Sequence, residues 1–178
     1  MSNSVKNIMI VGVGGQGTLL ASKLLGYVLM QQGYDVKVSE VHGMSQRGGD
    51  VQSNLRISTE RIWSDLIPKG ECDLILSLEP MEALRYLPWL SKGGWIVTNS
   101  TPFVNIPNYP PVEEITAELQ KIGNVITLDC DEIAKQTGSP RSANMVLLGA
   151  SAAVLEILDP EKLREGITNV FSRKGEKI

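Results

Sequence analysis

The chain has 178 residues, with 17 Lys and Arg against 20 Asp and Glu, which gives a formal net charge of -3 at pH 7. This length fits one domain whose core buries most of the surface that the unfolded chain exposes. The hydrophobic content of 42% is ordinary for a globular protein. The slightly acidic balance lacks the basic excess typical of nucleic-acid binders, so nucleic acid is not expected as a partner.

Cysteine content and hydropathy exclude further classes of protein. Structural zinc and iron–sulfur clusters take about four ligands, mostly Cys and His, whereas this chain has only Cys72 and Cys130, far apart in sequence. Two such cysteines are typical of free, buried thiols in a cytosolic protein. The first residues show no signal-peptide pattern, and the most apolar stretch, residues 146–158, is shorter than the roughly 18 residues of a membrane helix. We therefore expect a cytoplasmic protein without membrane contact.

The first forty residues predict a strand, a helix and a second strand. Residues 8–11 are a short apolar run, typical of a strand buried on both faces of a parallel sheet. Apolar residues then recur at helical spacing over residues 20–31, and Gly33 ends the helix. Valines resume a strand over residues 36–41. This order predicts a βαβ unit that opens a parallel sheet.

The middle of the chain predicts more strands and one helix. Alternating polarity over residues 51–58 predicts a strand, and residues 60–67 are expected to return antiparallel beside it. Residues 72–78 predict a buried strand. Pro80 suits the first turn of a helix, which the apolar positions extend to Leu90.

The next segment leads to a surface excursion. Gly93 and Gly94 are expected to turn the chain into a strand over residues 95–98. Residues 101–111 contain four prolines and two asparagines, which predicts a surface loop rather than a domain linker.

The last third predicts one strand, over residues 125–128, and then helices. Asp129 or Asp131 caps the first of these helices. The expected helices span residues 132–136, 143–158 and 160–171. Because strands and helices alternate throughout, the chain is predicted to be one domain, residues 1–178, with a three-layer, Rossmann-like α/β fold and a mainly parallel sheet.

A glycine motif follows the first predicted strand. Gly12-Val-Gly-Gly-Gln-Gly17 opens a helix, as the dinucleotide-binding fingerprint does. Its glycines permit a tight turn, and the helix N-terminus can face an anion. Glu40 ends the second strand, near the position of an acid that binds ribose. The same glycines also permit close helix–sheet packing without a ligand, and Gln16 can equally hydrogen-bond across a subunit contact.

The densest polar segment is Glu40-Val-His-Gly-Met-Ser-Gln-Arg-Gly-Gly49. It follows a strand, so it projects from the carboxyl edge of the sheet, where open α/β folds bind ligands or partners. Arg47 among glycines suits a carboxylate or a phosphate. His42 is the only imidazole, and a single His is more typical of a packed or capping residue than of a catalyst. Ser45 does not lie in the G-x-S-x-G pattern of a hydrolase.

Together, these two glycine-rich segments resemble the gamma-type domain of the 2-oxoacid:ferredoxin oxidoreductase family, and within it the indolepyruvate type. Further matches follow in the same order along almost the whole chain. They are Ser77-Leu-Glu-Pro-Met-Glu-Ala-Leu-Arg-Tyr86, Gly93-Gly94 leading to Asn99, Asn144-Met-Val-Leu-Leu-Gly-Ala150, and Lys174-Gly-Glu-Lys177. Two positions depart from the family pattern: Ser45 stands where Ala is common, and Asp50 where Ser is common.

The resemblance implies a small (beta) subunit of an enzyme that oxidatively decarboxylates 2-oxoacids. Such enzymes use thiamine diphosphate with Mg²⁺ and [4Fe-4S] clusters, coenzyme A accepts the acyl group, and ferredoxin accepts the electrons. For the indolepyruvate type, the substrates are arylpyruvates and the products aryl-acetyl-CoA thioesters. This chain has no Cys-rich run and no Gly-Asp-Gly followed by paired asparagines. The cofactors are therefore expected on a large (alpha) partner subunit, and the isolated chain is expected to be inactive.

By resemblance, the two glycine-rich loops line the contact with the partner's active site and help to form the approach for coenzyme A. Both loops leave the carboxyl ends of strands. No catalytic residue and no metal ligand is assigned to this chain. The candidate site residues are Gly12, Gly14, Gly15, Gln16, Gly17, Glu40, His42, Gly43, Met44, Gln46, Arg47, Gly48 and Gly49.

Two other functions stay open at this point. One is a stand-alone module that binds NAD or a related nucleotide, which depends on the glycine fingerprint and Glu40. A dehydrogenase normally needs a second domain for its substrate, and 178 residues leave little room for one. The other is an orphan interaction domain that has kept the fold without the complex. Titration with NADH tests the first alternative, and capture of a partner tests the second.

Overall fold

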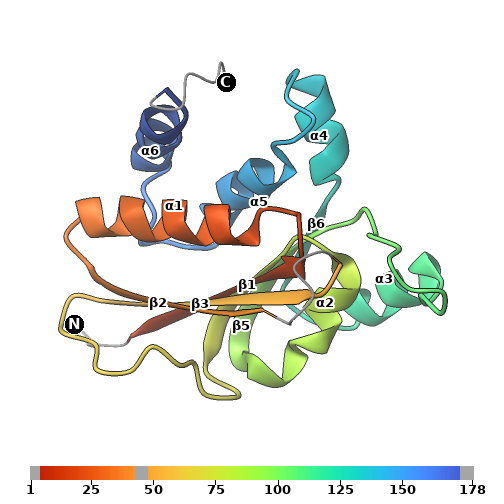
Figure 1. The fold of residues 1–178 in the computed structure, drawn as a ribbon. Coiled ribbons are helices and arrows are strands. Elements are labelled where there is room, and N and C mark those ends of the chain that lie inside the picture. Colours follow the sequence, from red (N-terminus) through yellow and green to blue (C-terminus); the bar gives the residue numbers. More distant parts are fainter. Residues whose placement is uncertain (1–4, 43–47, 173–178) are drawn as a thin grey trace.

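The computed structural model describes residues 5–42 and 48–172. A six-stranded sheet lies at its centre, in the order β2-β3-β1-β4-β5-β6 (Figure 1). Neighbouring strands run parallel from β1 through β4 and β5 to β6, whereas β3 runs antiparallel to both β1 and β2. The strands are β1 (Lys6–Val13), β2 (Asp35–His42), β3 (Asp50–Ser58), β4 (Cys72–Ser77), β5 (Leu90–Asn99) and β6 (Val125–Leu128).

Helices cover both faces of the sheet, so the predicted three-layer α/β fold with a mainly parallel sheet is confirmed. Figure 1 shows α1, α5 and α6 on one side of the sheet. That side has α1 (Thr18–Gln31), α4 (Cys130–Gln136), α5 (Ala143–Ser151) and α6 (Pro160–Ser172). The other side has α2 (Pro80–Arg85), a 3-10 turn (Leu87–Trp89) and α3 (Val112–Gln120). No helix in these described ranges is long and apolar enough to cross a membrane.

The core consists of two apolar clusters, one on each face of β1. Ile8 and Ile10 pack with leucines of α1 and α5. Met9 and Val11 point to the opposite face and pack with α2 and α3. All four side chains have an exposed fraction of 0%. Because side chains alternate along a strand, a continuous apolar run of this kind requires cover on both faces, as the sequence predicts.

The predicted βαβ unit is present as β1, α1 and β2, and its two strands are parallel, but β3 lies between them and runs antiparallel to both. Strand β3 pairs along its whole length with β1, from Lys6 opposite Ile57 to Val13 opposite Asp50. It also pairs with β2 over eight residues. Antiparallel neighbours need only a short connection, so the chain returns directly from β2 into β3 and fills the position beside β1.

Several predicted boundaries also differ from the structure. Residues 60–67 form no strand; they cross beneath the antiparallel strands, where the Ile62 N–H donates to Asp35 Oδ2 (2.6 Å). Helix α2 ends at Arg85 because Pro88 has no N–H to continue it, and Leu90 already belongs to β5.

Other differences concern the second half of the chain. Gly93 and Gly94 lie inside β5 rather than at a turn before it. Helix α3 follows Pro111 and was not predicted, although Glu113 and Glu114 occupy its first turn. Helix α5 ends at Ser151, well before the predicted residue 158. The cap of α4 is Asp129, whose side chain accepts a hydrogen bond from the Glu132 N–H.

Substitutions at Gly166 in α6 and at Gly149 in α5 can test how closely α6 packs on α1. A Cβ at Gly166 would overlap Val28 Cγ2, whereas a Cβ at Gly149 would meet nothing within 4 Å. Gly149→Ala therefore gains only helix propensity, about 0.5–1 kcal/mol. Gly166→Ala has the same gain but overpacks a buried valine, which costs about 1–3 kcal/mol. We expect urea unfolding to show Gly166→Ala less stable than Gly149→Ala by about that cost; equal stabilities would contradict this packing.

Candidate functional site

The side chain of Gln16 fills the loop between β1 and α1. Its Oε1 accepts a hydrogen bond from the Val13 N–H (2.7 Å), and its Nε2 donates to the Leu78 carbonyl (3.1 Å). A Cβ at Gly12 would lie 2.8 Å from Gln16 Oε1, so glycine is needed for this inward position. Gln16 therefore bonds within the chain and ties the glycine loop to Leu78, the residue that follows β4.

Gly15 and Gly17 have positive φ angles, +106° and +84°, which favour glycine. Gly17 is the N-cap of α1, and its carbonyl accepts a hydrogen bond from Asn144 Nδ2 (3.3 Å) at the start of α5. A Cβ at Gly17 would lie 2.5 Å from that nitrogen. Gly15, in contrast, is exposed and faces open space. The inner end of the loop is therefore packed within the chain, and its tip is free to meet another molecule.

The two predicted glycine-rich segments meet at the carboxyl end of β1. The Gly14 N–H donates to the Gly49 carbonyl (2.8 Å), and the Gly48 N–H donates to the Gly14 carbonyl (3.4 Å). Gly48 also has a positive φ, +76°. The remaining candidates of the second loop, Gly43, Met44, Gln46 and Arg47, lie outside the described residues.

Glu40 and His42 lie on β2 and are separated from the glycine loop. Glu40 is opposite Ser53 of β3, and Ser53 is in turn opposite Ile10 of β1. His42 is the last residue of β2, opposite Val51. In a dinucleotide site, the acid lies at the end of the strand beside the glycine-bearing strand, where it reaches the ribose. Because β3 occupies that place and Gln16 fills the loop, this geometry does not favour nucleotide binding.

The sequence analysis missed a group of polar side chains at the same edge of the sheet. Tyr86 donates its hydroxyl to both carboxylate oxygens of Asp50 (2.9 Å each), and burial raises the pKa of Tyr86. Asp50 directly follows Gly49, so this bond holds the end of the second glycine loop against the residue that follows α2. Nearby, Arg85 pairs with Glu82 (2.9 Å), and burial raises the pKa of Glu82.

Glu79 is a charged residue with an exposed fraction of 0%. Its Oε2 accepts the Glu82 N–H (2.9 Å) and so caps α2. Its Oε1 accepts the Phe103 N–H (3.3 Å) and the Tyr109 hydroxyl. Burial beside this carboxylate raises the pKa of Tyr109. The Glu79-Pro80 pair signals a helix start in the sequence, but nothing local in the sequence signals the contacts with residues 101–111.

The loop of residues 101–111 belongs to this edge as well. Asn105 Nδ2 donates to the Gly48 carbonyl (2.6 Å), which joins the loop to the second glycine segment. At the start of the loop, Asn99 Nδ2 donates to Asp131 (2.7 Å), and Asn99 Oδ1 accepts the Cys130 N–H (3.0 Å). Three loops, at residues 12–17, 48–49 and 101–111, therefore form one connected rim.

The two cysteines lie in the apolar core of the domain. Cys72 packs in the cluster on the α2 side of the sheet, and Cys130 packs in the cluster on the α1 side. Both are free and buried, and burial raises the pKa of each thiol to about 12. Thiols of this kind stay protonated near neutral pH, so they are poor metal ligands and nucleophiles. Within residues 5–42 and 48–172, no cluster of three or more His, Cys, Asp or Glu is placed to hold a metal ion.

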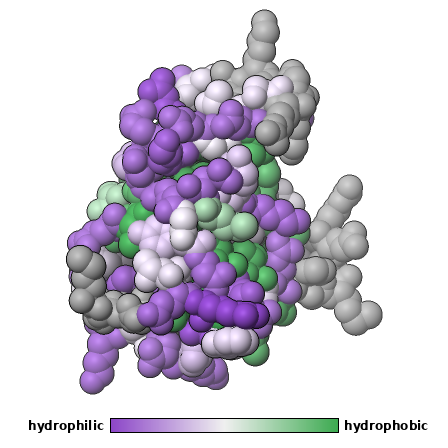
Figure 2. Space-filling view, turned by 90° about the vertical axis from the view of Figure 1, so that its left-hand side faces the viewer, coloured by the Kyte–Doolittle hydropathy of each residue, from purple (hydrophilic) through white to green (hydrophobic). Residues whose placement is uncertain are grey.

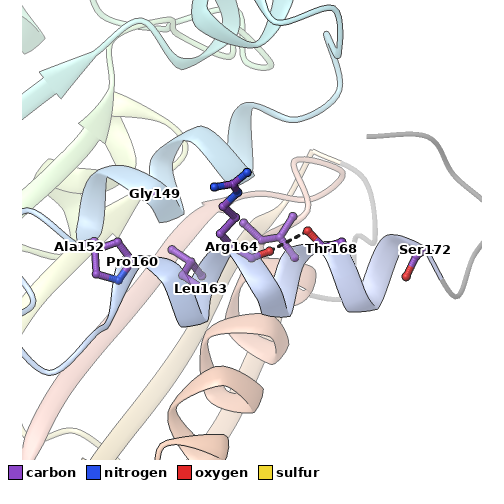
Figure 3. A pocket seen from close by; sticks show the side chains of 8 residues that line it. Gly149, Ala152, Pro160, Leu163, Arg164, Thr168 and Ser172 are labelled. Atoms are coloured by element: carbon purple, nitrogen blue, oxygen red, sulfur yellow. Dashed lines mark hydrogen bonds between the residues drawn. The ribbon is translucent and has the colours of Figure 1, made fainter.

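Two grooves flank α6. The first, of about 510 Å³, lies between α5 and α6, where Gly149 and Ala152 face α6 (Figure 3). Arg164 is the one charged side chain among the described residues of its lining, and the Thr168 hydroxyl donates to the Arg164 carbonyl. The second groove, of about 590 Å³, begins at Leu20 in the first turn of α1. Its polar lining is Arg141, Asn144 and the hydroxyls of Thr137, Ser139 and Ser142.

The chain belongs to the pyruvate ferredoxin/flavodoxin oxidoreductase family, whose sequence profile matches residues 7–178. It is 42% identical over 152 residues to indolepyruvate oxidoreductase subunit IorB of Pyrococcus horikoshii, a match that covers 81% of this chain and 75% of that protein. Relatives of the same name from three further organisms are 39–42% identical. The resemblance found in the sequence motifs is thereby confirmed.

Two further comparisons show how this domain occurs elsewhere. The gamma subunit of a keto/oxoacid ferredoxin oxidoreductase from Geobacter sulfurreducens has the same fold, with a TM-score of 0.67 and 25% identity over 92% of this chain and 85% of that one. Ketoisovalerate oxidoreductase subunit VorA of Methanothermobacter thermautotrophicus is 30% identical over 172 residues, which are 96% of this chain but 33% of that protein. A domain of this kind therefore occurs both as a separate chain and within a longer one.

The hydrogen bonds of Gln16 lead to a prediction about stability. Gln16→Ala leaves the buried Val13 N–H without its side-chain acceptor and removes one of the two hydrogen bonds to the Leu78 carbonyl, which keeps that from Asn99 Nδ2 (3.4 Å); the loss costs about 1–3 kcal/mol. Gln120→Ala, at the exposed end of α3, is the control and should change stability by less than about 0.5 kcal/mol. Denaturant unfolding measures both. A Gln16→Ala variant as stable as the control would show that Gln16 does not hold the loop.

Proposed function

We propose that this chain is the small subunit of a 2-oxoacid:ferredoxin oxidoreductase that converts arylpyruvates, with indolepyruvate as the leading substrate, into aryl-acetyl-CoA. The observation that carries this proposal is the 42% identity to indolepyruvate oxidoreductase subunit IorB over most of both chains. Similarity to subunits named for ketoisovalerate is lower, at 30% or less. The aryl 2-oxoacids are therefore the favoured substrate class.

In this proposal the cofactors belong to a large alpha subunit. Thiamine diphosphate with Mg²⁺ would supply the decarboxylation chemistry there, and [4Fe-4S] clusters would pass electrons to ferredoxin. The two buried thiols of this chain, Cys72 and Cys130, have no role as cluster ligands, since they lie on opposite faces of the sheet. We propose the cytoplasm as the location of the complex, and the free thiols, which suit a reducing compartment, support this.

In the complex, this chain contributes a surface that borders the partner's active site. The rim at the carboxyl edge of the sheet supports this role, because it is held rigidly by Gln16, Asp50 and Glu79. The tip of the first loop, Gly15, is exposed and unobstructed. Because glycine has no side chain, a second backbone or a ligand can approach this surface closely.

Coenzyme A is proposed to approach along this side of the chain. The groove of about 590 Å³ beside the first turn of α1 supports this approach. Among the described residues that line it, Arg141 alone is charged, and Asn144 connects the groove to the glycine loop through Gly17. A cationic group among hydroxyls suits the phosphates of the co-substrate.

The experiment is anaerobic reconstitution of this chain with the large subunit encoded by the same organism. The complex should reduce viologen when it is given an arylpyruvate and coenzyme A, whereas this chain alone should not. A higher kcat/KM for indolepyruvate than for pyruvate or 2-oxoglutarate would support the aryl class. A preference for pyruvate, or an isolated chain that binds NADH and forms no complex, would contradict the proposal.

Arg47 provides a variant for the same assay. Arg47→Ala should lower turnover of the assembled complex by about tenfold or more, the order expected when a charge-assisted contact is lost. Arg61→Ala is the control, since Arg61 is exposed and rests on Trp63 (4.2 Å from its ring). Loss of thermal stability in Arg47→Ala with unchanged turnover per intact complex would show that Arg47 is a structural residue.

A further inference from the structure

The loop of residues 101–111 presents three large apolar side chains to solvent. The exposed fractions are 42% for Phe103, 67% for Val104 and 37% for Ile106. Single exposed apolar residues are normal on protein surfaces, but a group of three within four positions of one loop is unfavourable in water and typical of an interaction site.

This loop is held in one conformation by polar contacts at several points. The Phe103 N–H and the Tyr109 hydroxyl both donate to Glu79 Oε1. At the start of the loop, the Thr101 hydroxyl donates to Asp129 Oδ1 (3.2 Å). The three apolar side chains are therefore carried by a pre-formed support, and binding through them loses little conformational entropy.

The group that fixes the loop is the carboxylate of Glu79, and this side chain has an exposed fraction of 0%. Removing a carboxylate from water is costly unless hydrogen-bond donors replace the lost hydration. Two of the three donors to this carboxylate come from the loop, and the third is the Glu82 N–H. The carboxylate thus has all three donors only when the loop is in place, so the shape of the loop and the stability of the domain are linked.

The loop is continuous with the rim of glycine residues. Asn105 Nδ2 donates to the Gly48 carbonyl (2.6 Å), and the neighbouring Gly49 accepts from the Gly14 N–H (2.8 Å). A molecule that covers the glycine loops therefore also meets the apolar side chains of this loop. Figure 2 shows the side of the molecule on the left of Figure 1, where hydrophilic residues cover most of the view.

We infer that Phe103, Val104 and Ile106 dock into an apolar surface of the large subunit. The inference rests on the proposed function, and it identifies the surface through which the two subunits recognise each other. The longer relative VorA supports the choice of partner, since the region that matches 96% of this chain is 33% of that protein. In VorA, a domain of this kind is therefore joined in one chain to further sequence of the same oxidoreductase subunit.

Two exposed aliphatic side chains, Val104 and Leu66, allow a matched test. Val104 has an exposed fraction of 67%, and Leu66, in the segment beneath β2 and β3, has one of 62%. We would immobilise the large subunit anaerobically and measure the dissociation constants of the wild-type chain, Val104→Asp and Leu66→Asp. Both positions are exposed, so both variants should fold, and thermal unfolding checks this.

Val104→Asp should raise the dissociation constant by about tenfold or more, because a charge would enter an apolar contact. Leu66→Asp should bind within about twofold of the wild type. Val104→Asp binding as tightly as Leu66→Asp would overturn the docking inference alone. A wild-type chain that does not bind the large subunit would overturn the proposed function as well. A wild-type chain that forms a homodimer, separated into monomers by Val104→Asp, would show that a second copy occupies the loop.

Discussion

The buried carboxylate of Glu79 organises the carboxyl edge of this domain. It lies between the end of β4 and the start of α2, and it accepts hydrogen bonds from Glu82, Phe103 and Tyr109. Since a fully buried charge is tolerated only with a complete set of donors, α2 and the loop of residues 101–111 depend on each other. The loop of residues 101–111 is therefore tied to the core at this edge.

A second constraint is the antiparallel strand β3, which lies between β1 and β2. It brings Gly48 and Gly49 beside Gly14, because the chain enters β3 directly after the second glycine loop. It also moves Glu40 two strands away from β1. The same insertion thus removes the arrangement of a dinucleotide site and creates a rim made of backbone and glycine. Such a rim suits contact with another protein subunit.

The sequence was most informative where the physical signal is local. The apolar run at residues 8–11 and the left-handed Gly33 predict β1 and the end of α1, because burial and φ act within a few residues. The glycine loops could be predicted to share an edge, since parallel strands end on the same side. The order of the strands in the sheet could not be predicted from the sequence, because it depends on which strands pair across long sequence separations.

The contacts that hold the rim show the same limit. Tyr109 reaches Glu79 over 30 residues and Asn105 reaches Gly48 over 57, and neither pair leaves a pattern in the chain. Residues 60–67 are expected from the sequence to pair as a strand, yet Ile62 and Ile67 are buried without any strand partner. Trp63 and Leu66 of the same segment are exposed (82% and 62%), so hydropathy reports neither which of its apolar side chains are buried nor whether the backbone is paired.

The central claim is that the carboxyl edge of the sheet faces the large subunit. Hydrogen–deuterium exchange of this chain, free and in the reconstituted complex, tests it most directly. The account predicts slower exchange in the complex at residues 12–17, 48–49 and 101–106, with no change at residues 60–66. Slower exchange at residues 60–66 and along β2, with the three loops unchanged, would contradict it.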